Sequence, residues 1–161
     1  YKGTPPLRTD EDVQALRRAV AEGTIDVIGT DHAPHTAEDK ECEWSCAAHG
    51  MTGLETALAV VQSTLVDTGL IGWERVAQIM SRTPARILGL TDQGQELAPG
   101  ATANIVLWDP SGQTPVDPTI HASKGRNSPY RGMTLPGGVR ATFYRGHPVV
   151  RDGEPATPLT R

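Results

Sequence analysis

Three ionisable side chains lie close together in the segment Asp31–His35. Asp31 and His32 are adjacent, and His35 follows Pro34, which stiffens the turn that brings the second imidazole back towards the carboxylate. A carboxylate in such a cluster can bind a metal ion and can take a proton from water held by that metal. These residue types favour metal-assisted hydrolysis. The alternative interpretation is a turn in which Asp31 caps a helix and both histidines are exposed.

The elements before this cluster follow the order expected of a parallel α/β protein. Thr9 and Asp12 form the pattern of a capping box, apolar residues then repeat at helical spacing up to Val20, and Gly23 predicts the end of the helix. Residues 24–30 are rich in β-branched side chains and are predicted to form a strand. Because active sites of such proteins lie where the strands end, the position of the cluster favours a functional role.

Three further helices are predicted after the loop that follows the cluster, from capping signals and from apolar residues at helical spacing. They are expected over residues 54–65, 73–81 and 83–88. The first follows a second capping pattern, at Thr52 and Glu55, and the last is expected to begin with Thr83 as its N-cap and Pro84 in its first turn.

The last third of the chain is predicted to be rich in β-structure. A strand is expected over residues 103–108 and is expected to end at Asp109, and a hairpin is expected over residues 141–150. Prolines and glycines recur between these segments. The change in pattern divides the chain into residues 1–94 and a separate small domain at residues 95–161.

Composition and charge exclude several classes of function. The chain has 161 residues and a net charge of −4, and its lysines and arginines are scattered, so nothing indicates nucleic acid or an anionic membrane as a partner. No apolar run approaches the roughly 20 residues that span a bilayer. Tyr1 is not followed by the apolar region of a signal peptide. We therefore expect a cytoplasmic protein, and the start at Tyr1 predicts a fragment of a longer one.

Sequence motifs along nearly the whole chain carry a family resemblance. The most specific is the Asp-His-Ala-Pro-His sequence of Asp31–His35. The other motifs, in chain order, are Pro5–Arg8, Gly50–Thr56, Ser81–Ala85, Ala98–Asn104 and Ser123–Tyr130. In this combination they resemble dihydroorotases of the amidohydrolase superfamily. Dihydropyrimidinases and allantoinases share the Asp-His pair but usually lack the second histidine.

The resemblance implies an α/β fold and an activity. Residues 1–94 would form the last strand and helices of a (β/α)8 TIM-type barrel, and residues 95–161 would form the C-terminal part of a small β-sandwich domain. The implied activity is the zinc-dependent, reversible hydrolysis of the cyclic amide L-dihydroorotate to N-carbamoyl-L-aspartate in de novo pyrimidine (UMP) biosynthesis. Two zinc ions are expected, with most of their ligands in a missing N-terminal segment, so the chain alone would be inactive.

The resemblance also implies roles for individual residues. Asp31 would bind one zinc ion and act as general base and general acid, and His35 would contact the carboxylate of the substrate. The backbone at His49 and Gly50 would contact the substrate's ring, and a glycine suits this role because a ligand can approach its main chain closely. Thr4 stands where the family usually has an asparagine that contacts substrate; threonine keeps a hydroxyl but lacks the amide's paired donor and acceptor.

Three alternatives stay open at this point. One is a non-catalytic dihydroorotase-like subunit that scaffolds aspartate transcarbamoylase, although the presence of Asp31 and His35 argues against it. Another is a hydantoinase or allantoinase acting on a related ring. The third concerns Cys42, Cys46 and His49, which resemble a small zinc site but lack a fourth ligand nearby, so the cysteines are expected to be reduced and packed. A homo-oligomer is expected, with aspartate transcarbamoylase as a candidate partner.

Overall fold

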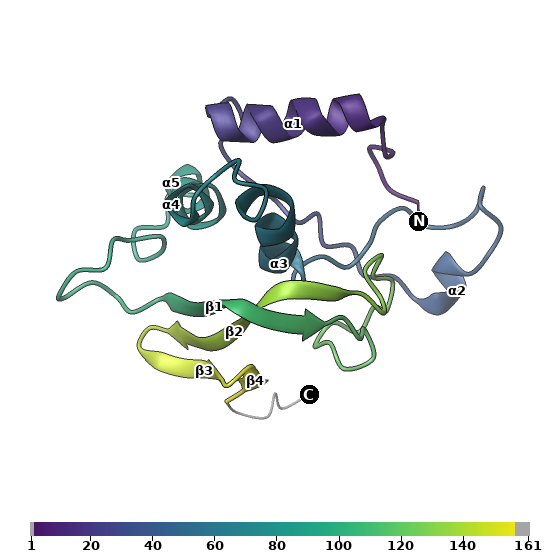
Figure 1. The fold of residues 1–161 in the computed structure, drawn as a ribbon. Helices are drawn as coiled ribbons and strands as arrows, with labels where there is room; N and C mark the ends of the chain where they lie inside the picture. The colour runs from purple at the N-terminus through teal and green to yellow at the C-terminus, as the bar shows by residue number, and fades with distance from the viewer. Residues whose placement is uncertain (1, 157–161) are drawn as a thin grey trace.

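The computed structural model describes residues 2–156 and shows a layer of helices lying over one antiparallel sheet (Figure 1). The helical elements, in chain order, are α1 (Asp10–Glu22), α2 (Ala37–Lys40), α3 (Ala57–Val61), the π-helix η1 (Gln62–Val66), α4 (Trp73–Ala77), the π-helix η2 (Gln78–Arg82) and α5 (Thr83–Ile87). The strands are β1 (Ile105–Pro115), β2 (Thr134–Tyr144), β3 (His147–Arg151) and β4 (Glu154–Pro155).

Helix α1 has the bounds that its local sequence predicts. The hydroxyl of Thr9 accepts a hydrogen bond from the backbone N–H of Asp12, and the carboxylate of Asp12 accepts one from the backbone N–H of Thr9, at 3.3 and 3.2 Å. Gly23 ends the helix in the left-handed conformation, with φ at 88°. The capping box and the glycine stop are therefore both confirmed.

The other long helical segments differ from the predictions. The helix expected from Leu54 begins at Ala57 instead, because Glu55 does not complete a capping box with Thr52. The carboxylate of Glu55 instead accepts hydrogen bonds from the backbone N–H groups of Ala122 and Ser123, at 3.2 and 3.3 Å. A contact with a distant segment thus replaces the local cap.

The predicted break before Pro84 is also wrong, because α4, η2 and α5 follow one another without an interruption. Thr83 has helical backbone angles, with φ at −68° and ψ at −45°, and is not an extended N-cap. The wider turn of η2 ends at Arg82, two residues before Pro84, which has no N–H to give to a helical hydrogen bond. The chain therefore stays helical through the proline.

The sheet has the order β1-β2-β3-β4, with each pair antiparallel. The predicted hairpin is confirmed, with Tyr144 opposite His147. The prediction that the first strand ends at Asp109 is wrong: the pairing of β1 with β2 is interrupted between Asp109 and Gln113 and then continues. In the interruption the carboxylate of Asp109 accepts hydrogen bonds from the N–H and hydroxyl of Ser111, at 3.0 and 2.7 Å, which hold the turn and let the strand resume.

Residues 24–30 do not form a strand within the part of the chain that the structure describes. The backbone N–H of Ile28 donates to the carbonyl of Ile79 at 3.1 Å, and the guanidinium of Arg75 donates to the carbonyl of Ile25 at 2.8 Å. A β-branched segment becomes a strand only where a neighbouring strand pairs with its backbone, and β1 to β4 pair only with one another. The predicted strand is therefore absent from residues 2–156.

Two apolar clusters hold the helices together and attach them to the sheet. The first packs around the fully buried Ile79 and consists of Val20, Val61, Leu65, Ile71, Val76 and Ile79. The second joins α3 to the sheet and consists of Ala59, Val116 and Leu135. Beside it, the indole N–H of Trp108 donates to the side-chain oxygen of buried Gln62 at 2.8 Å, so a polar contact also ties β1 to η1.

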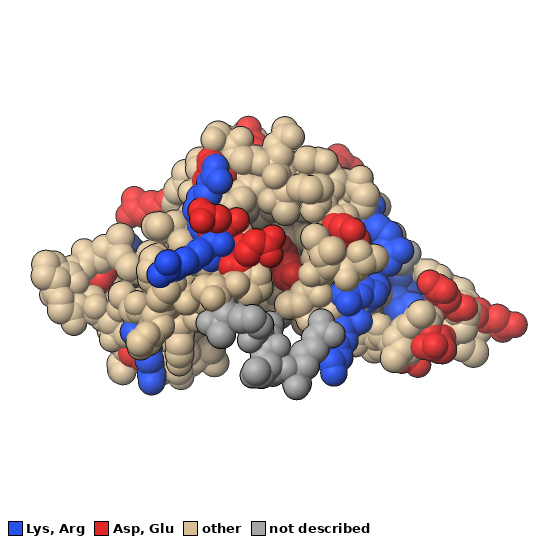
Figure 2. All heavy atoms as spheres, turned by 90° about the horizontal axis from the view of Figure 1, so that it is seen from below, with Lys and Arg blue, Asp and Glu red and all other residues tan. Residues whose placement is uncertain are grey.

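The surface of the molecule carries charges of both signs. Seen from below, uncharged side chains cover most of the face shown in Figure 2, and lysines and arginines lie beside aspartates and glutamates. Among the residues described, none of the helices is both long enough and apolar enough to span a bilayer.

Candidate functional site

Asp31 has an unusual backbone conformation for a residue with a side chain. Its φ is +45°, in the left-handed region, which aspartate tolerates better than most residues. The residue is exposed, so its carboxylate is accessible to a ligand. Backbone strain of this kind persists where the surrounding structure imposes it and is concentrated at functional sites.

The segment after Asp31 runs beside the segment around Met51. His32 and Met51 form a parallel bridge, and the backbone N–H of Ala33 donates to the carbonyl of Met51 at 2.9 Å. The Nδ1 atom of His32 accepts hydrogen bonds from the backbone N–H groups of Gly53 and Leu54, at 3.0 and 3.3 Å. His32 therefore fixes the position of the second segment relative to Asp31.

His35 is half-buried and lies against the predicted substrate-contacting backbone. Its Nε2 atom is 2.8 Å from the carbonyl oxygen of His49. Because a carbonyl oxygen only accepts, Nε2 is the donor in this contact, and Nδ1 is left for another partner. The structure thus brings together two residues for which the resemblance implies substrate contacts, with one ring nitrogen of His35 already occupied.

Gly50 has a conformation and a position that require glycine. Its φ is +124°, and a Cβ atom there would lie 2.5 Å from the Cβ of Ala33. The carbonyl of Gly50 accepts hydrogen bonds from the ammonium group of Lys40 at 2.9 Å and from the side-chain amide of Asn127 at 3.2 Å. The close approach of Ala33 thus explains the glycine, independently of any ligand.

The N-terminal segment that carries Thr4 is attached to the same place. The backbone N–H of Gly50 donates to the carbonyl of Lys2 at 2.8 Å, and the ammonium group of Lys2 donates to the carbonyl of Trp44 at 2.7 Å. Thr4 itself is exposed. Thr4, His35, His49 and Gly50 therefore come from adjoining segments on one side of the molecule.

Asn127 is the residue that the sequence motifs did not single out. Its side-chain oxygen accepts a hydrogen bond from the backbone N–H of His35 at 3.1 Å, and its side-chain nitrogen donates to the carbonyls of Ala33 and Gly50, at 3.0 and 3.2 Å. Asn127 is 92 residues from His35 in the sequence, so no local pattern predicts these contacts. Its only signal was its place within the Ser123–Tyr130 motif.

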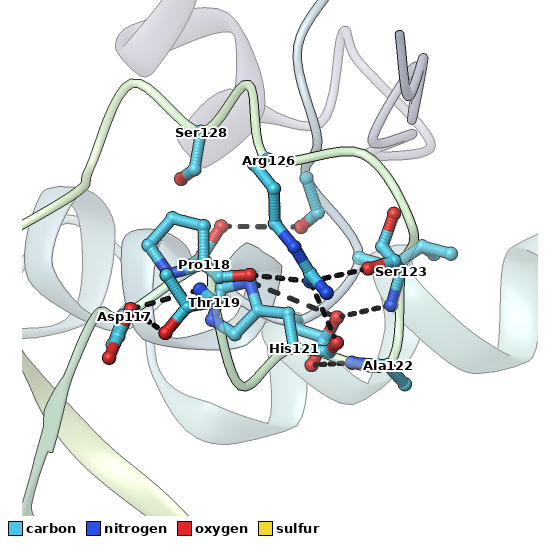
Figure 3. A network of polar contacts seen from close by, with 12 residues as sticks. Asp117, Pro118, Thr119, His121, Ala122, Ser123, Arg126 and Ser128 are labelled. Atoms are coloured by element: carbon cyan, nitrogen blue, oxygen red, sulfur yellow. Dashed lines mark hydrogen bonds and ion pairs between the residues drawn. The ribbon is translucent and has the colours of Figure 1, made fainter. Parts of the chain in front are cut away.

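The loop before Asn127 is held by a network of polar contacts (Figure 3). The guanidinium of Arg126 donates to the carbonyls of Pro118, His121 and Ser123, at 2.6, 3.0 and 2.7 Å, and points into the loop that these residues form. Glu55 joins the network from the turn before α3, and its carboxylate lies 3.9 Å from Nδ1 of His121. Asn127 therefore projects from a loop whose shape is fixed on several sides.

The start of this loop shows the same pattern of polar contacts. The carboxylate of Asp117 accepts hydrogen bonds from the N–H and hydroxyl of Thr119, at 2.9 and 2.7 Å. These bonds stabilise the ionised form and lower the pKa of the Asp117 carboxyl below its ordinary value. The turn at residues 117–119 is therefore stabilised by a charged group.

The donor set for a metal ion is incomplete within residues 2–156. There, no three or more side chains of His, Cys, Asp or Glu lie close enough together to hold a metal. The exposed carboxylate of Asp31 suits zinc as one ligand, but protein zinc sites take three or four protein ligands. Cys42 and Cys46 are free thiols, and the expectation that they are packed is wrong because both are exposed.

Most of this chain is similar to known hydrolases. Residues 4–149 match the model of the amidohydrolase family. The dihydroorotase of Leifsonia xyli subsp. xyli is 54% identical over 153 residues, which cover 95% of this chain and 35% of that protein. The dihydroorotase of Streptomyces coelicolor is 54% identical over 154 residues, covering 96% and 36%. The chain thus spans about a third of the length of these curated relatives.

Solved structures of related hydrolases share the fold. The L-hydantoinase (dihydropyrimidinase) from Arthrobacter aurescens has a TM-score of 0.89 at 33% identity, and the match covers 97% of this chain and 35% of that one. The dihydropyrimidinase from Brevibacillus agri NCHU1002 has a TM-score of 0.88 at 28% identity, with the same coverage. The resemblance to dihydroorotases predicted from the motifs is confirmed by the curated relatives. The family match extends over most of the residues, and the chain belongs to the amidohydrolase family.

Proposed function

We propose that this chain is the C-terminal part of a dihydroorotase, a cytoplasmic enzyme that reversibly hydrolyses L-dihydroorotate to N-carbamoyl-L-aspartate in pyrimidine synthesis. The proposal depends on one observation above all. An exposed carboxylate, Asp31, precedes a histidine, His35, that is fixed against the segment around Gly50. This arrangement occurs in a chain that is 54% identical to two dihydroorotases.

The proposed architecture is a TIM-type barrel with an attached β-sandwich. Residues 24–30 would be the eighth strand and would place Asp31 at the C-terminal mouth of the barrel, where active sites of this fold lie. Residues 1–94 would complete the barrel, and residues 95–161 would contribute β1 to β4 to the sandwich. The β-branched composition of residues 24–30 supports this proposal, because such a segment forms a strand where a neighbouring strand pairs with it, and among residues 2–156 it pairs with none.

In this proposal Asp31 both binds metal and moves a proton. Two zinc ions, held mostly by residues outside this chain, would supply a water molecule of lowered pKa and would stabilise negative charge on the ring carbonyl. Asp31 accepts the proton of the attacking water and returns it to the leaving ring nitrogen, as general acid–base catalysis requires. The accessible carboxylate of Asp31 supports both roles.

His35 has a separate role, in which it binds the carboxylate of the substrate. Its Nε2–H is engaged by the carbonyl of His49, which fixes the plane of the ring. Its Nδ1 then faces the substrate, and it donates a hydrogen bond when the ring carries both protons. The backbone at His49 and Gly50 and the side chain of Thr4 would line the rest of the substrate site.

The experiment that tests the proposal compares three substrates on the whole protein that carries this chain. We expect hydrolysis of dihydroorotate and little or no turnover of hydantoin and allantoin. Preference for hydantoin would make the protein a hydantoinase, as the structural similarity to L-hydantoinase allows. Absence of turnover, together with binding to aspartate transcarbamoylase, would indicate a scaffold subunit.

Size-exclusion chromatography with and without aspartate transcarbamoylase tests the expected homo-oligomer and that partner.

A further inference from the structure

One side chain connects the two segments that would contact substrate. The amide of Asn127 accepts from the N–H of His35 and donates to the carbonyls of Ala33 and Gly50, at 3.1, 3.0 and 3.2 Å. Its own backbone carbonyl accepts from the N–H of Thr52 at 3.2 Å. Asn127 thus holds the His35 segment and the Gly50 segment at one separation.

An asparagine side chain is well suited to these three bonds. It offers an acceptor on one atom and two donors on the other, and here it meets one N–H and two carbonyls. Aspartate has the same size but no donor, so its second oxygen would face the carbonyls of Ala33 and Gly50. Alanine would leave all three backbone groups without this partner.

The loop that carries Asn127 reaches this position by a close approach of two backbones. A Cβ atom on Gly125 would lie 2.6 Å from the Cβ of Pro34 and 2.9 Å from Oδ1 of Asn127. Real side chains avoid such distances, so the glycine permits the loop to pack directly on the turn between Asp31 and His35. Arg126, which binds three carbonyls of the same loop, keeps the loop in shape.

We propose that Asn127 is a positioning residue for substrate binding: it sets the placement of His35 relative to the backbone at Gly50. It acts through His35 and does not touch the reacting atoms. The kinetic part of this inference rests on the proposed function, whereas the structural part does not. Because Asn127 makes no hydrogen bond to Asp31 among the described residues, its loss affects binding more than the chemical step.

The test uses the whole protein with the variants Asn127→Ala and Asn127→Asp. The matched control is Asn104→Ala, because the side chain of Asn104 also joins two distant segments, donating to the carbonyl of Asp92 at 2.6 Å and accepting from the N–H of Arg145 at 2.8 Å. We expect Asn127→Ala to raise KM for dihydroorotate on the order of tenfold, at a nearly unchanged kcat. Asn127→Asp, which keeps the size and the acceptor, should raise KM at least as much. Asn104→Ala should leave KM unchanged.

A double-mutant cycle with His35→Ala separates positioning from a merely structural role. If Asn127 acts through His35, Asn127→Ala raises KM much less in the His35→Ala background than in the wild type. An equal rise in both backgrounds, or an equal rise in Asn104→Ala, overturns the inference. An unchanged KM in both Asn127 variants also overturns it.

Amide hydrogen exchange provides a readout that needs no turnover. Asn127→Ala should speed exchange in residues 31–35 and 49–53, and Asn104→Ala should not. If the wild type fails to hydrolyse dihydroorotate, the proposed function is wrong, but faster exchange in these two segments still supports the positioning role. Unchanged exchange there in both Asn127 variants refutes it whatever the substrate.

Discussion

The Nε2 atom of His35 donates a hydrogen bond of 2.8 Å to the carbonyl oxygen of His49, so the protein's own backbone occupies one edge of this imidazole. A ligand that binds the ring in this arrangement approaches it from the side of Nδ1. The contact also orients the ring, which reduces the conformational freedom lost when a substrate binds. The contact with His49 thus leaves the Nδ1 edge of the His35 ring for a ligand.

This arrangement predicts the effect of His35→Ala on substrate binding. A charge-assisted hydrogen bond to the substrate's carboxylate contributes about 1.5–3 kcal/mol, so KM for dihydroorotate should rise roughly 10- to 100-fold. Both metals should stay bound. The control is His147→Ala, which removes an exposed imidazole at the start of β3. Unchanged kinetics would mean that His35 only packs the loop, and metal loss would make it a ligand.

The role proposed for Asp31 predicts a different kinetic change. Asp31→Asn removes the proton acceptor and weakens a metal ligand, so kcat should fall by about 10²- to 10⁴-fold, the usual contribution of a general acid–base group. Asp10→Asn, which alters another exposed aspartate, in the first turn of α1, is the matched control and should keep full activity. An Asp31→Asn enzyme that keeps its metals and most of its kcat would disprove the assignment.

Metal dependence gives a prediction about the two cysteines as well. A chelator should abolish activity of the whole protein, and zinc should restore it, because the proposed hydrolysis needs an activated water. Cys42→Ser and Cys46→Ser should keep the same metal content by atomic absorption, since both thiols are exposed and free. Loss of one metal equivalent in either variant would instead place a zinc ion beside His49.

The sheet predicts a pH dependence of stability that is unrelated to activity. The hydroxyl of Ser111 and the guanidinium of Arg140, the latter at 2.7 Å, lower the pKa of Asp109 from 3.8 to about 2. A carboxyl whose pKa is lowered in the folded state stabilises the protein at pH values above its pKa in the unfolded state. This stabilisation is lost as the pH falls towards its pKa in the folded state. The stabilisation should therefore be complete above about pH 4 and disappear towards pH 2.

Urea denaturation of the whole protein and of Asp109→Asn checks this prediction. The difference in free energy of unfolding between the two proteins should be larger at pH 6 than at pH 2. Ser111→Ala, which removes the largest cause of the shift, should reduce the pH-dependent part while leaving the carboxylate in place. A difference that is the same at both pH values would contradict the assigned pKa.

Features that depend on neighbouring residues were predictable from the sequence. The capping box of Thr9 and Asp12 and the stop at Gly23 gave α1 its bounds, because these interactions lie within a few residues. The family motifs imply substrate contacts for both His35 and the Gly50 segment, and the structure brings these two segments together; the substrate contacts themselves stay a prediction.

Features that depend on distant segments were not predictable. Glu55 looked like the second half of a local cap, but its carboxylate binds backbone groups 67 and 68 residues away. Residues 24–30 have the composition of a strand, but composition does not supply the neighbouring strand that pairing requires. Asn127 lies in one of the family motifs, but nothing in its local sequence predicts its hydrogen bonds to Ala33, His35 and Gly50.

Because His35 and Asn127 are 92 residues apart in the sequence, the ribosome adds them at different times during synthesis. At about 5–20 residues per second, a ribosome needs roughly 5–18 s to add the 92 residues between them. Before Asn127 is added, the nascent chain contains Asp31, His35 and Gly50 but lacks the Asn127 side-chain amide that bonds to the His35 and Gly50 segments. A message that ends before the codon for Asn127 would therefore yield a polypeptide that has the proposed site residues of this chain but lacks the side chain that bonds to both the His35 and the Gly50 segment.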